Sequence, residues 1–287
     1  MSRVAYVNGR YLPHRAASVH IEDRGYQFAD GVYEVIAVQH GALVDEDLHL
    51  QRLERSLHEL RIAEPMTEGA LKTVMREVIR RNRVRDGIIY LQMTRGASPR
   101  DHAFPKSPVT QVVMTARRGK PPSPETIAAG VRVISIPDLR WARCDIKSVS
   151  LLPNVLGKQQ AREAGAYEAW QIDRDGNVTE GTSTNAWIVT EAGEVVTRQA
   201  SDAILNGITR LAVIKVLEEH QLRLVERPFS LTEAKRAREA FLTSTTAFVL
   251  PVVRIDDADV GGGKPGPLTR RLRDLYAEHV EAEGRLG

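Results

Sequence analysis

The stretch Arg143-Cys144-Asp145-Ile146-Lys147-Ser148-Val149-Ser150-Leu151-Leu152 places a lysine beside a short apolar run. It comes shortly after Val131 to Ile136, a β-branched segment that predicts a strand. Most lysines of folded proteins are exposed, so this stretch alone favours a solvated side chain at the edge of a sheet. The alternative is a reactive amine, and features elsewhere in the chain decide between the two interpretations.

A carboxylate lies downstream in Val178-Thr179-Glu180-Gly181-Thr182-Ser183-Thr184-Asn185, at the head of a run of small hydroxyl and amide side chains. Glu180 follows a predicted turn at Asp175-Gly176-Asn177, and Gly181 allows another group to approach the backbone closely. Taken singly, Glu180 is an exposed carboxylate at the end of a strand. A lysine that can form a Schiff base and a carboxylate that can pair with a protonated pyridine nitrogen are together what an enzyme using pyridoxal phosphate (PLP) requires.

The composition is ordinary for a globular protein. The chain has 287 residues, of which 42% are hydrophobic and 27% charged, which is enough for two modest domains or one large one. The net charge is only +3, and arginines alternate with glutamates, as in Arg52-Leu53-Glu54-Arg55. This alternation indicates solvated helix faces rather than a nucleic-acid interface.

Several other classes of protein are poorly supported. Cys144 is the only cysteine, so an internal disulfide and a cysteine metal cluster are excluded, and a small core residue is the better interpretation of its thiol. Neither metal-ligand spacings nor glycine-rich nucleotide motifs occur, so we expect no metal. No apolar run approaches the roughly 20 residues of a membrane span, and no secretory signal opens the chain. We therefore expect a cytoplasmic protein without a membrane or nucleic-acid partner.

The predicted elements mix hairpins and helices without regular βαβ alternation, which favours an α+β fold. Asn8-Gly9 predicts a hairpin turn, and Thr67 predicts the N-cap of a helix. Three prolines and a glycine in Arg117-Arg118-Gly119-Lys120-Pro121-Pro122-Ser123-Pro124 indicate a linker. We expect a small N-terminal domain over 1–118, a linker over 119–124 and a larger cofactor-binding domain over 125–287.

PLP carries a phosphate, so the chain should provide an anion site. Gly207-Ile208-Thr209 opens a predicted helix that ends at His220, and the free N–H groups at a helix start bind phosphate. Thr243-Ser244-Thr245-Thr246 follows a predicted strand and offers more hydroxyls and amides. Arg52 could supply a positive charge, although its local context favours a solvated helix face. Taken singly, the helix start is better explained as an ordinary cap, whereas the Thr243–Thr246 segment is equally compatible with a polar turn.

In combination, six segments of the chain resemble the class IV, fold-type IV PLP-dependent aminotransferases, most closely those that act on D-amino acids. The resemblance covers nearly the whole length and keeps the order of the family's motifs. One departure is Ala29, where many relatives have glycine. The six segments are Glu22–Glu34, His49–Leu53, Cys144–Ser148, Thr179–Gly181, Gly207–Arg210 and Thr243–Thr246.

The resemblance implies a fold, a cofactor and roles for individual residues. It implies two domains with PLP in the cleft between them, and a homodimer in which both subunits contribute to each site. Lys147 is then the catalytic lysine, held in the family's Schiff-base strand, and Glu180 pairs with the pyridine nitrogen. The residues implied to bind the phosphate are Arg52, Ile208, Thr209, Ser244 and Thr245.

The implied reaction is ping-pong transfer of an amino group from a D-amino acid to a 2-oxo acid such as 2-oxoglutarate. Tyr33, Arg100 and His102 are implied to bind the substrate carboxylate, with Arg100 and His102 two residues apart on a polar loop. The alternatives on the same scaffold are a branched-chain L-amino acid aminotransferase, an R-selective amine transaminase and aminodeoxychorismate lyase. A rival of a different class is a basic nucleic-acid-binding protein without a chromophore.

Overall fold

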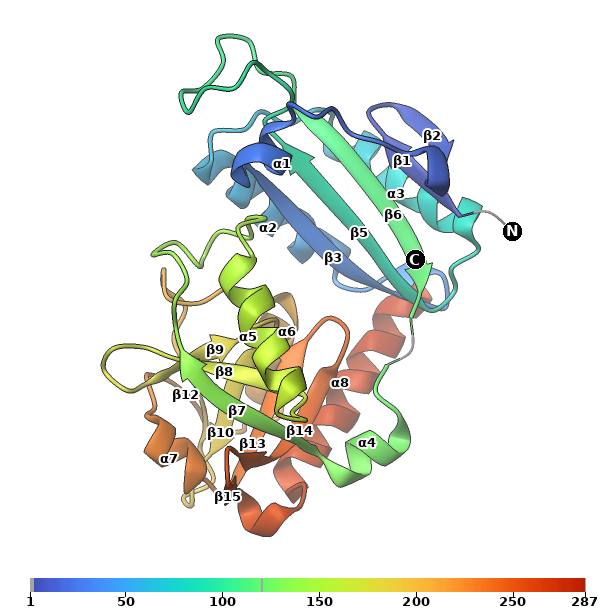
Figure 1. Cartoon of the computed structure of the whole chain (residues 1–287). Helices are drawn as coiled ribbons and strands as arrows, with labels where there is room; N and C mark the ends of the chain where they lie inside the picture. Colours follow the sequence, from blue (N-terminus) through green and yellow to red (C-terminus); the bar gives the residue numbers. More distant parts are fainter. Residues whose placement is uncertain (1–2, 120, 287) are drawn as a thin grey trace. The chain divides into compact units, whose positions relative to one another are not determined.

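The computed structural model describes residues 3–119 and 121–286, with side chains described as far as residue 282. The chain forms two compact units, each with its own sheet (Figure 1). The first unit contains the described part of Met1–Lys120, the short segment Ile146–Ser150 and the end of the last helix. The second contains Pro121–Asp145 and Leu151–Val280. The helices and sheets of both units confirm the predicted α+β class.

The first unit is built on a six-stranded antiparallel sheet with strand order β2-β1-β6-β5-β3-β4. Its strands are β1 (Val4–Val7), β2 (Arg10–Pro13), β3 (Gly31–Gln39), β4 (Ala42–Leu43), β5 (Gly87–Thr94) and β6 (Gln111–Arg118). Its helices are the 3-10 helix η1 (His14–Ala16), α1 (Arg24–Phe28), α2 (Glu46–Glu59) and α3 (Glu68–Asn82).

Local sequence signals explain where these elements begin and end. Asn8 and Gly9 both have positive φ, 48° and 86°, which is the conformation of the hairpin turn predicted there. The Thr67 side chain accepts a hydrogen bond from the Ala70 N–H, so the predicted cap of α3 is confirmed. Asp23 caps α1 in the same way by accepting from the Gly25 and Tyr26 N–H groups.

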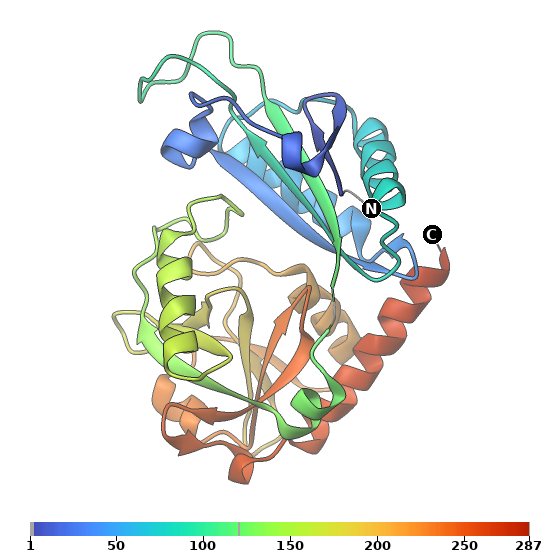
Figure 2. The same cartoon turned by 45° about the vertical axis from the view of Figure 1, so that its right-hand side comes forward.

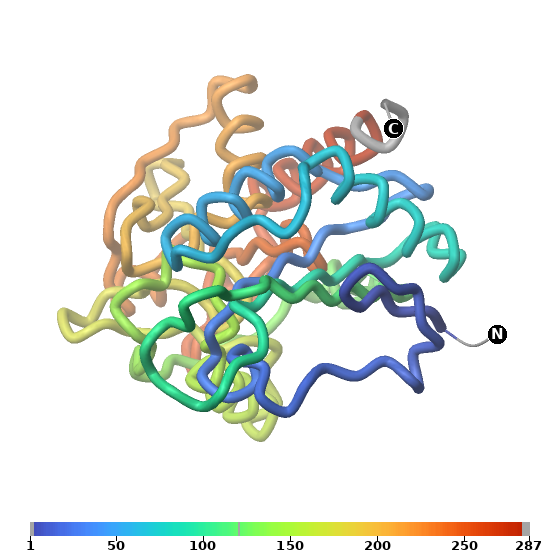
Figure 3. The backbone as a smooth tube through the Cα atoms, turned by 90° about the horizontal axis from the view of Figure 1, so that it is seen from above, coloured from blue at the N-terminus to red at the C-terminus, as the bar shows by residue number. Residues whose placement is uncertain are grey.

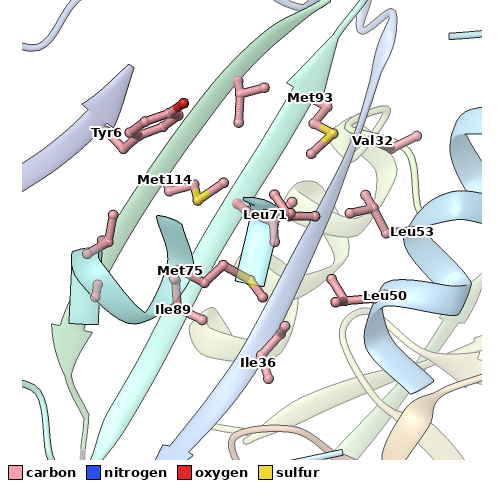
Figure 4. Packing of buried hydrophobic residues seen from close by; sticks show 14 of the residues in the cluster. Tyr6, Val32, Ile36, Leu50, Leu53, Leu71, Met75, Ile89, Met93 and Met114 are labelled. Atoms are coloured by element: carbon pink, nitrogen blue, oxygen red, sulfur yellow. The ribbon is translucent and has the colours of Figure 1, made fainter. Parts of the chain in front are cut away.

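Helices α2 and α3 cover one face of this sheet, and the core of the unit lies between them and the strands (Figure 1). Figure 4 shows Leu50 and Leu53 of α2 and Leu71 and Met75 of α3 among the side chains of the central strands. All four are at most 6% exposed. Burying each such side chain contributes about 1.5–3 kcal/mol before entropy losses, so the apolar faces of the two helices fix them on the sheet.

The second unit is built on a larger mixed sheet with strand order β12-β11-β10-β13-β14-β7-β8-β9, and β15 pairs with β14. Its strands are β7 (Val131–Pro137), β8 (Glu168–Ile172), β9 (Val178–Gly181), β10 (Asn185–Val189), β11 (Val195–Thr197), β12 (Leu224–Glu226), β13 (Glu239–Ser244), β14 (Phe248–Ile255) and β15 (Ala258–Asp259). Its helices are α4 (Pro124–Ala129), α5 (Leu152–Glu163), α6 (Ile208–Glu219), α7 (Leu231–Lys235), the 3-10 helix η2 (Gly261–Gly263) and most of α8 (Pro267–Leu286).

Helix α5 packs against β7 and β8, and α6 packs against β13 (Figure 2). The core includes Trp170, Ile188, Leu242 and Leu250, all fully buried. Among the described residues no helix is both long and apolar enough to cross a membrane.

The segment with Lys147 differs from its prediction. Residues 143–151 contain no strand, only an isolated bridge between Ser148 and Val32. The segment lies at the start of β3, where Tyr33 N donates to the Lys147 carbonyl and Val149 N donates to the Gly31 carbonyl, each at 3.0 Å. Two backbone hydrogen bonds are too few to propagate a ladder, so the predicted Schiff-base strand is wrong at this position.

The same contacts explain why Ile146–Ser150 clusters with the first unit, although the sequence division assigned these residues to the domain over 125–287. Ile146 is 4% exposed and joins the core of the first unit. The chain passes from the first unit to the second at Pro121, within the predicted linker.

Candidate active site

Lys147 is held by its backbone, while its amine is unengaged. The Lys147 N–H donates to the Ser56 hydroxyl at 3.3 Å, in addition to the bond that its carbonyl accepts from Tyr33. Its Nζ lies 4.4 Å from the centre of the Tyr33 ring. Among the described residues no hydrogen bond or ion pair engages this Nζ, so a predicted catalytic amine is available for reaction.

A buried ionic cluster lies in the same unit. Glu34, next to Tyr33 on β3, accepts two hydrogen bonds of 2.8 Å from Arg52 and one of 2.8 Å from His49 Nδ1. Burial raises the pKa of Glu34, but the charge and hydrogen bonds of Arg52 outweigh it and hold this pKa at about 2. Burial lowers the pKa of His49. Arg52 is thus fixed by a carboxylate that the sequence analysis did not identify.

Arg100 and His102, which were predicted to bind the substrate carboxylate, lie on the exposed loop between β5 and β6. The Arg100 guanidinium is 4.6 Å from the centre of the Phe28 ring, and the His102 ring is 5.3 Å from it. The described residues include no hydrogen bond or ion pair to either side chain. Among the described residues no hydrogen bond, ion pair or ring contact joins Tyr33 to Arg100 or His102; the Tyr33 ring lies 5.8 Å from the Tyr90 ring.

Glu180 is at the end of β9 in the second unit and is 6% exposed. Its carboxylate accepts hydrogen bonds from the Arg140 guanidinium, the Asn185 amide at 3.0 Å and the Leu205 N–H at 3.1 Å. Burial raises the pKa of Glu180, and the positive charge of Arg140 opposes that rise. The carboxylate is therefore oriented by fixed donors before any ligand binds.

Arg140 is the main residue of this site that the sequence analysis missed. It also donates to Asp138 at 2.6 Å and to the Ala203 carbonyl at 3.0 Å. Although burial lowers the pKa of Arg140, its bond to Asp138 and the charge of Glu180 raise it above the usual value. Glu180 is 40 positions away in the sequence, so only the folded sheet brings the pair together.

The start of α6 is tied to Glu180. The Asn185 amide, which donates to Glu180, also donates to the Leu205 carbonyl at 2.9 Å. A Cβ added to Gly207, the N-cap of α6, would lie 2.1 Å from the Asn185 side-chain oxygen, so only glycine fits there. The N-cap residue Gly207 provides no capping side chain, and N–H groups at a helix start such as those of Ile208 and Thr209 are suited to binding an anion.

Ser244 and Thr245 follow β13, the strand against which α6 packs. The Ser244 hydroxyl accepts a hydrogen bond from the Ala247 N–H at 3.1 Å, which stabilises the turn between β13 and β14. Both side chains are half-buried. The structure therefore gathers Glu180 and the start of α6 in one unit, with the turn after the neighbouring β13, and Lys147, Tyr33 and Arg52 in the other.

Thr182 and Ser183, whose hydroxyls follow Glu180 in the sequence, form hydrogen bonds within the protein. Thr182 and Ser183 both donate to Glu168, a fully buried carboxylate on β8. Asn154 of α5 donates to the Thr182 carbonyl at 2.8 Å. These bonds fix the turn between β9 and β10, so they hold Glu180 and Asn185 in place rather than contacting a ligand.

The thiol of Cys144 is a core group. It lies 3.1 Å from the Trp141 carbonyl, and burial raises its pKa to about 11. A thiol with such a pKa is uncharged near neutral pH, which argues against a nucleophile.

The groups present fit PLP. An unengaged amine suits the cofactor's aldehyde, and a buried, oriented carboxylate suits its ring nitrogen. An uncapped helix start beside a hydroxyl-rich turn suits its phosphate.

The comparisons with known proteins agree with this chemistry. Residues 31–255 match the model of the family described as amino-transferase class IV. The chain belongs to the class IV aminotransferases. Members of this class depend on PLP, so the family, the aminotransferase activity and the cofactor that the sequence predicted are confirmed.

Two curated relatives are D-alanine aminotransferases. The chain is 43% identical to that of Bacillus licheniformis over 96% of both chains, and 38% identical to that of Staphylococcus haemolyticus over 96% of this chain and 98% of the relative.

Solved structures of branched-chain amino acid aminotransferases share the fold. The T.th. enzyme with pyridoxamine 5'-phosphate has a TM-score of 0.90 and 26% identity, covering 99% of this chain and 95% of that one. The Escherichia coli enzyme has a TM-score of 0.90 and 24% identity, covering 99% and 96%. The two-domain fold-type IV architecture is thereby confirmed.

Proposed function

We propose that this class IV aminotransferase transfers an amino group from a D-amino acid to a 2-oxo acid, with Lys147 as its catalytic residue. The observation that carries the D-amino acid preference is the placing of Arg100 and His102 on one aromatic ring, Phe28, with both side chains exposed and unpaired among the described residues. The identity to the D-alanine aminotransferases supports the same substrate class.

Lys147 would hold the cofactor covalently between turnovers and, once released, would move the proton from the substrate Cα. Its main chain is fixed by Tyr33 and Ser56, while its Nζ is unengaged. A fixed backbone with an amine free of hydrogen bonds suits a group that must first bind the cofactor and then transfer a proton. When bound, PLP supplies an electron sink for the charge left on Cα.

Glu180 would keep the ring nitrogen of the cofactor protonated. Its carboxylate accepts from Arg140, Asn185 and Leu205, with the Leu205 N–H shared between both oxygens, so a ring N–H would be the fourth donor to a carboxylate with about four acceptor positions. Burial raises the pKa of Glu180, so a positively charged partner is needed to keep it ionised. Arg140 provides part of that charge, and a protonated ring nitrogen would provide the rest.

The phosphate would be bound by Arg52 through its charge and by Ile208, Thr209, Ser244 and Thr245 through N–H or hydroxyl donors. The support is the uncapped start of α6 and the packing of α6 on β13, which ends at Ser244. Glu34 fixes the direction of the Arg52 guanidinium through two hydrogen bonds.

Tyr33, Arg100 and His102 would bind the substrate carboxylate, because a guanidinium is the best-shaped partner for a carboxylate. Fixing the carboxylate on one side determines which enantiomer presents its Cα hydrogen to Lys147.

We propose a homodimer in which the loop that carries Arg100 contributes to the active site of the partner subunit. The support is that no hydrogen bond, ion pair or ring contact joins Tyr33 to Arg100 or His102 among the described residues, and that Leu152, Val155 and Leu156 of α5 are exposed apolar residues that could take part in self-association. The cytoplasmic location stays a prediction.

The test compares amino donors with one acceptor, 2-oxoglutarate. We expect faster transamination of D-alanine than of L-leucine or L-valine by the holoenzyme. Arg100→Ala should lower kcat/KM for D-alanine, and the loss of transition-state stabilisation should be about 2–5 kcal/mol. The visible absorption of the cofactor should stay unchanged. Arg254→Ala, an exposed arginine of β14, is the control and should keep wild-type kinetics.

Branched-chain L-amino acids are the second candidate substrates, favoured by the fold similarity to branched-chain aminotransferases. Faster reaction with L-leucine than with D-alanine, and no effect of Arg100→Ala, would establish this alternative.

A further inference from the structure

The loop that carries Arg100 and His102 has no regular structure to hold it. Residues 98–110 contain neither helix nor strand, and a single bridge at Ala97 precedes them. A carboxylate site needs its donors placed to a fraction of an ångström, and exposed loops do not place side chains so closely without support. Some other group must therefore order this loop.

Arg24, the first residue of α1, is the group that binds the backbone next to Arg100 and on either side of His102. Its Nη1 donates to the carbonyls of Asp101 and Ala103, and its Nη2 donates to the carbonyl of His102 at 3.2 Å. Three consecutive carbonyls of the loop thus accept from one guanidinium. Figure 3 shows the loop beside the segment with α1, in agreement with these bonds.

Arg24 is itself fixed from the other side. It is 3% exposed, and its Nε donates to Asp30 at 2.7 Å. Asp30 also accepts two hydrogen bonds from Arg95, which is 2% exposed and donates to the carbonyls of Leu60 and Arg61. Burial raises the pKa of Asp30, but the hydrogen bonds from Arg95 and Arg24 outweigh it and lower this pKa, so the carboxylate stays ionised.

The side chain of Phe28, at the other end of α1, completes the arrangement. Arg24 lies 4.9 Å from its ring centre, on the same ring that contacts Arg100 and His102. Arg24 therefore fixes the backbone of the loop, and Phe28 orients the two side chains that the loop presents.

We propose that Arg24 is a positioning residue for substrate carboxylate recognition, holding the 101–103 backbone so that Arg100 and His102 face the carboxylate together. This inference rests on the proposed function of Arg100 and His102. A lysine could keep the charge beside Asp30, but its single ammonium cannot replace a planar fork that reaches Asp30 and three carbonyls at once. The geometry of the guanidinium, rather than its charge, is what the loop requires.

The experiment uses the holoenzyme and four variants: Arg24→Lys, Arg100→Ala, the double variant of these two, and Arg132→Lys. Arg132 is the matched control, because it also donates to two backbone carbonyls, those of Ala164 and Asp256, but in the second unit. For each protein, kcat and KM are measured with D-alanine, and the retained PLP is measured by absorption. The rate of tryptic cleavage after Arg100 is measured where that residue is present.

For Arg24→Lys we expect KM for D-alanine to rise and kcat/KM to fall by about tenfold or more, since small misplacements of binding groups have effects of this size. PLP content should stay at the wild-type level, and tryptic cleavage after Arg100 should become faster. The double variant should be no worse than Arg100→Ala, because both changes remove one interaction. Arg132→Lys should change neither the kinetics nor the cleavage.

The outcomes distinguish a failure of the positioning role of Arg24 from a failure of the proposed carboxylate site at Arg100 and His102. If Arg100→Ala reduces kcat/KM but Arg24→Lys changes neither KM nor the cleavage rate, the positioning role is wrong and the carboxylate site stands. Additive losses in the double variant would also overturn the positioning role. If Arg100→Ala has no effect on D-alanine kinetics, the proposed carboxylate site itself fails.

Should Arg24→Lys fail to fold, Phe28→Leu tests the same arrangement. Phe28 is half-buried, and leucine keeps an apolar side chain there without the aromatic face. A raised KM for D-alanine that is not additive with Arg100→Ala supports the arrangement, and an unchanged KM refutes it.

Discussion

The two residues predicted to act on the cofactor, Lys147 and Glu180, are held in opposite ways. Lys147 is fixed only through its backbone, and its amine makes no hydrogen bond within the described residues. The Glu180 carboxylate is fixed directly, by Arg140, Asn185 and Leu205. The difference teaches that the chain leaves without hydrogen bonds the amine that must change partners during a reaction, and fixes with several donors the carboxylate that must only stabilise a charge.

The largest effect should come from removing the amine of Lys147. Lys147→Ala should lower turnover by about 10⁴-fold or more, because both covalent attachment and proton transfer are lost. Turnover is measured with D-alanine and 2-oxoglutarate, and the visible absorption of the cofactor should change as well. Lys215→Ala, an exposed lysine of α6, should keep full activity. Wild-type turnover in Lys147→Ala would show that Lys147 is not the catalytic lysine.

Neutralising the fixed group should have a smaller effect. Glu180→Gln keeps the size of the side chain and one acceptor oxygen, but it removes the charge that retains a proton on the ring nitrogen, and its N–H₂ group cannot accept from Arg140, Asn185 or Leu205. We expect PLP to stay bound and the single-turnover rate with D-alanine to fall by about 10²–10³-fold, as for other preorganised electrostatic groups. Glu191→Gln, an exposed residue between β10 and β11, is the control. An unchanged single-turnover rate would remove Glu180 from the mechanism.

The contribution of Arg140 to holding Glu180 can be tested by measuring the stability of an Arg140 variant at two pH values. Arg140→Met leaves two buried carboxylates, Asp138 and Glu180, without their cation and should cost about 3 kcal/mol of folding free energy. Losing the cation raises both pKa values in the folded state, so the folded protein binds more protons than the unfolded chain and stability falls as pH rises. The loss in Tm relative to wild type should therefore be larger at pH 8 than at pH 5. A loss that is independent of pH would contradict this.

The smallest of these effects concerns Arg52. Arg52→Met should weaken PLP binding by about tenfold to a hundredfold, the usual size for a hydrogen bond to a charged group. Because Glu34 is fully buried and keeps only His49 as a hydrogen-bond partner when Arg52 is removed, the double variant Arg52→Met, Glu34→Gln distinguishes an effect on stability from an effect on PLP binding. It should recover Tm but not PLP affinity, measured by titration of the apoenzyme. Full recovery of affinity would show that the phosphate charge comes from another residue.

Sequence reasoning succeeded where the signal is local. The turn at Asn8-Gly9 and the cap at Thr67 need only neighbouring residues, and both occur as predicted. The motifs of the family also gave the cofactor and the class, because the chemistry of PLP demands a lysine and a carboxylate. The roles of the individual site residues stay predictions.

Sequence reasoning failed where the structure depends on distant partners. The resemblance implied a strand over Cys144–Ser148, but this segment pairs with the start of β3 through only two backbone hydrogen bonds and one isolated bridge. The ion pair of Arg140 with Glu180 and that of Arg52 with Glu34 join positions 40 and 18 apart, and no spacing rule identifies such pairs. The short helix α1 was not predicted, because five residues show no periodicity.

The segment Ile146–Ser150 has a consequence for how this enzyme can be divided. The chain enters the second unit at Pro121, returns to the first for these five residues, and leaves it again at Leu151. A gene cut before the codon for Pro121 would yield a first fragment that contains β3 but lacks Lys147. Recombination with a relative at that cut would also pair the start of β3 from one parent with the lysine segment of the other. Successful chimeras should therefore inherit Gly31–Tyr33 and Ile146–Ser150 from the same parent.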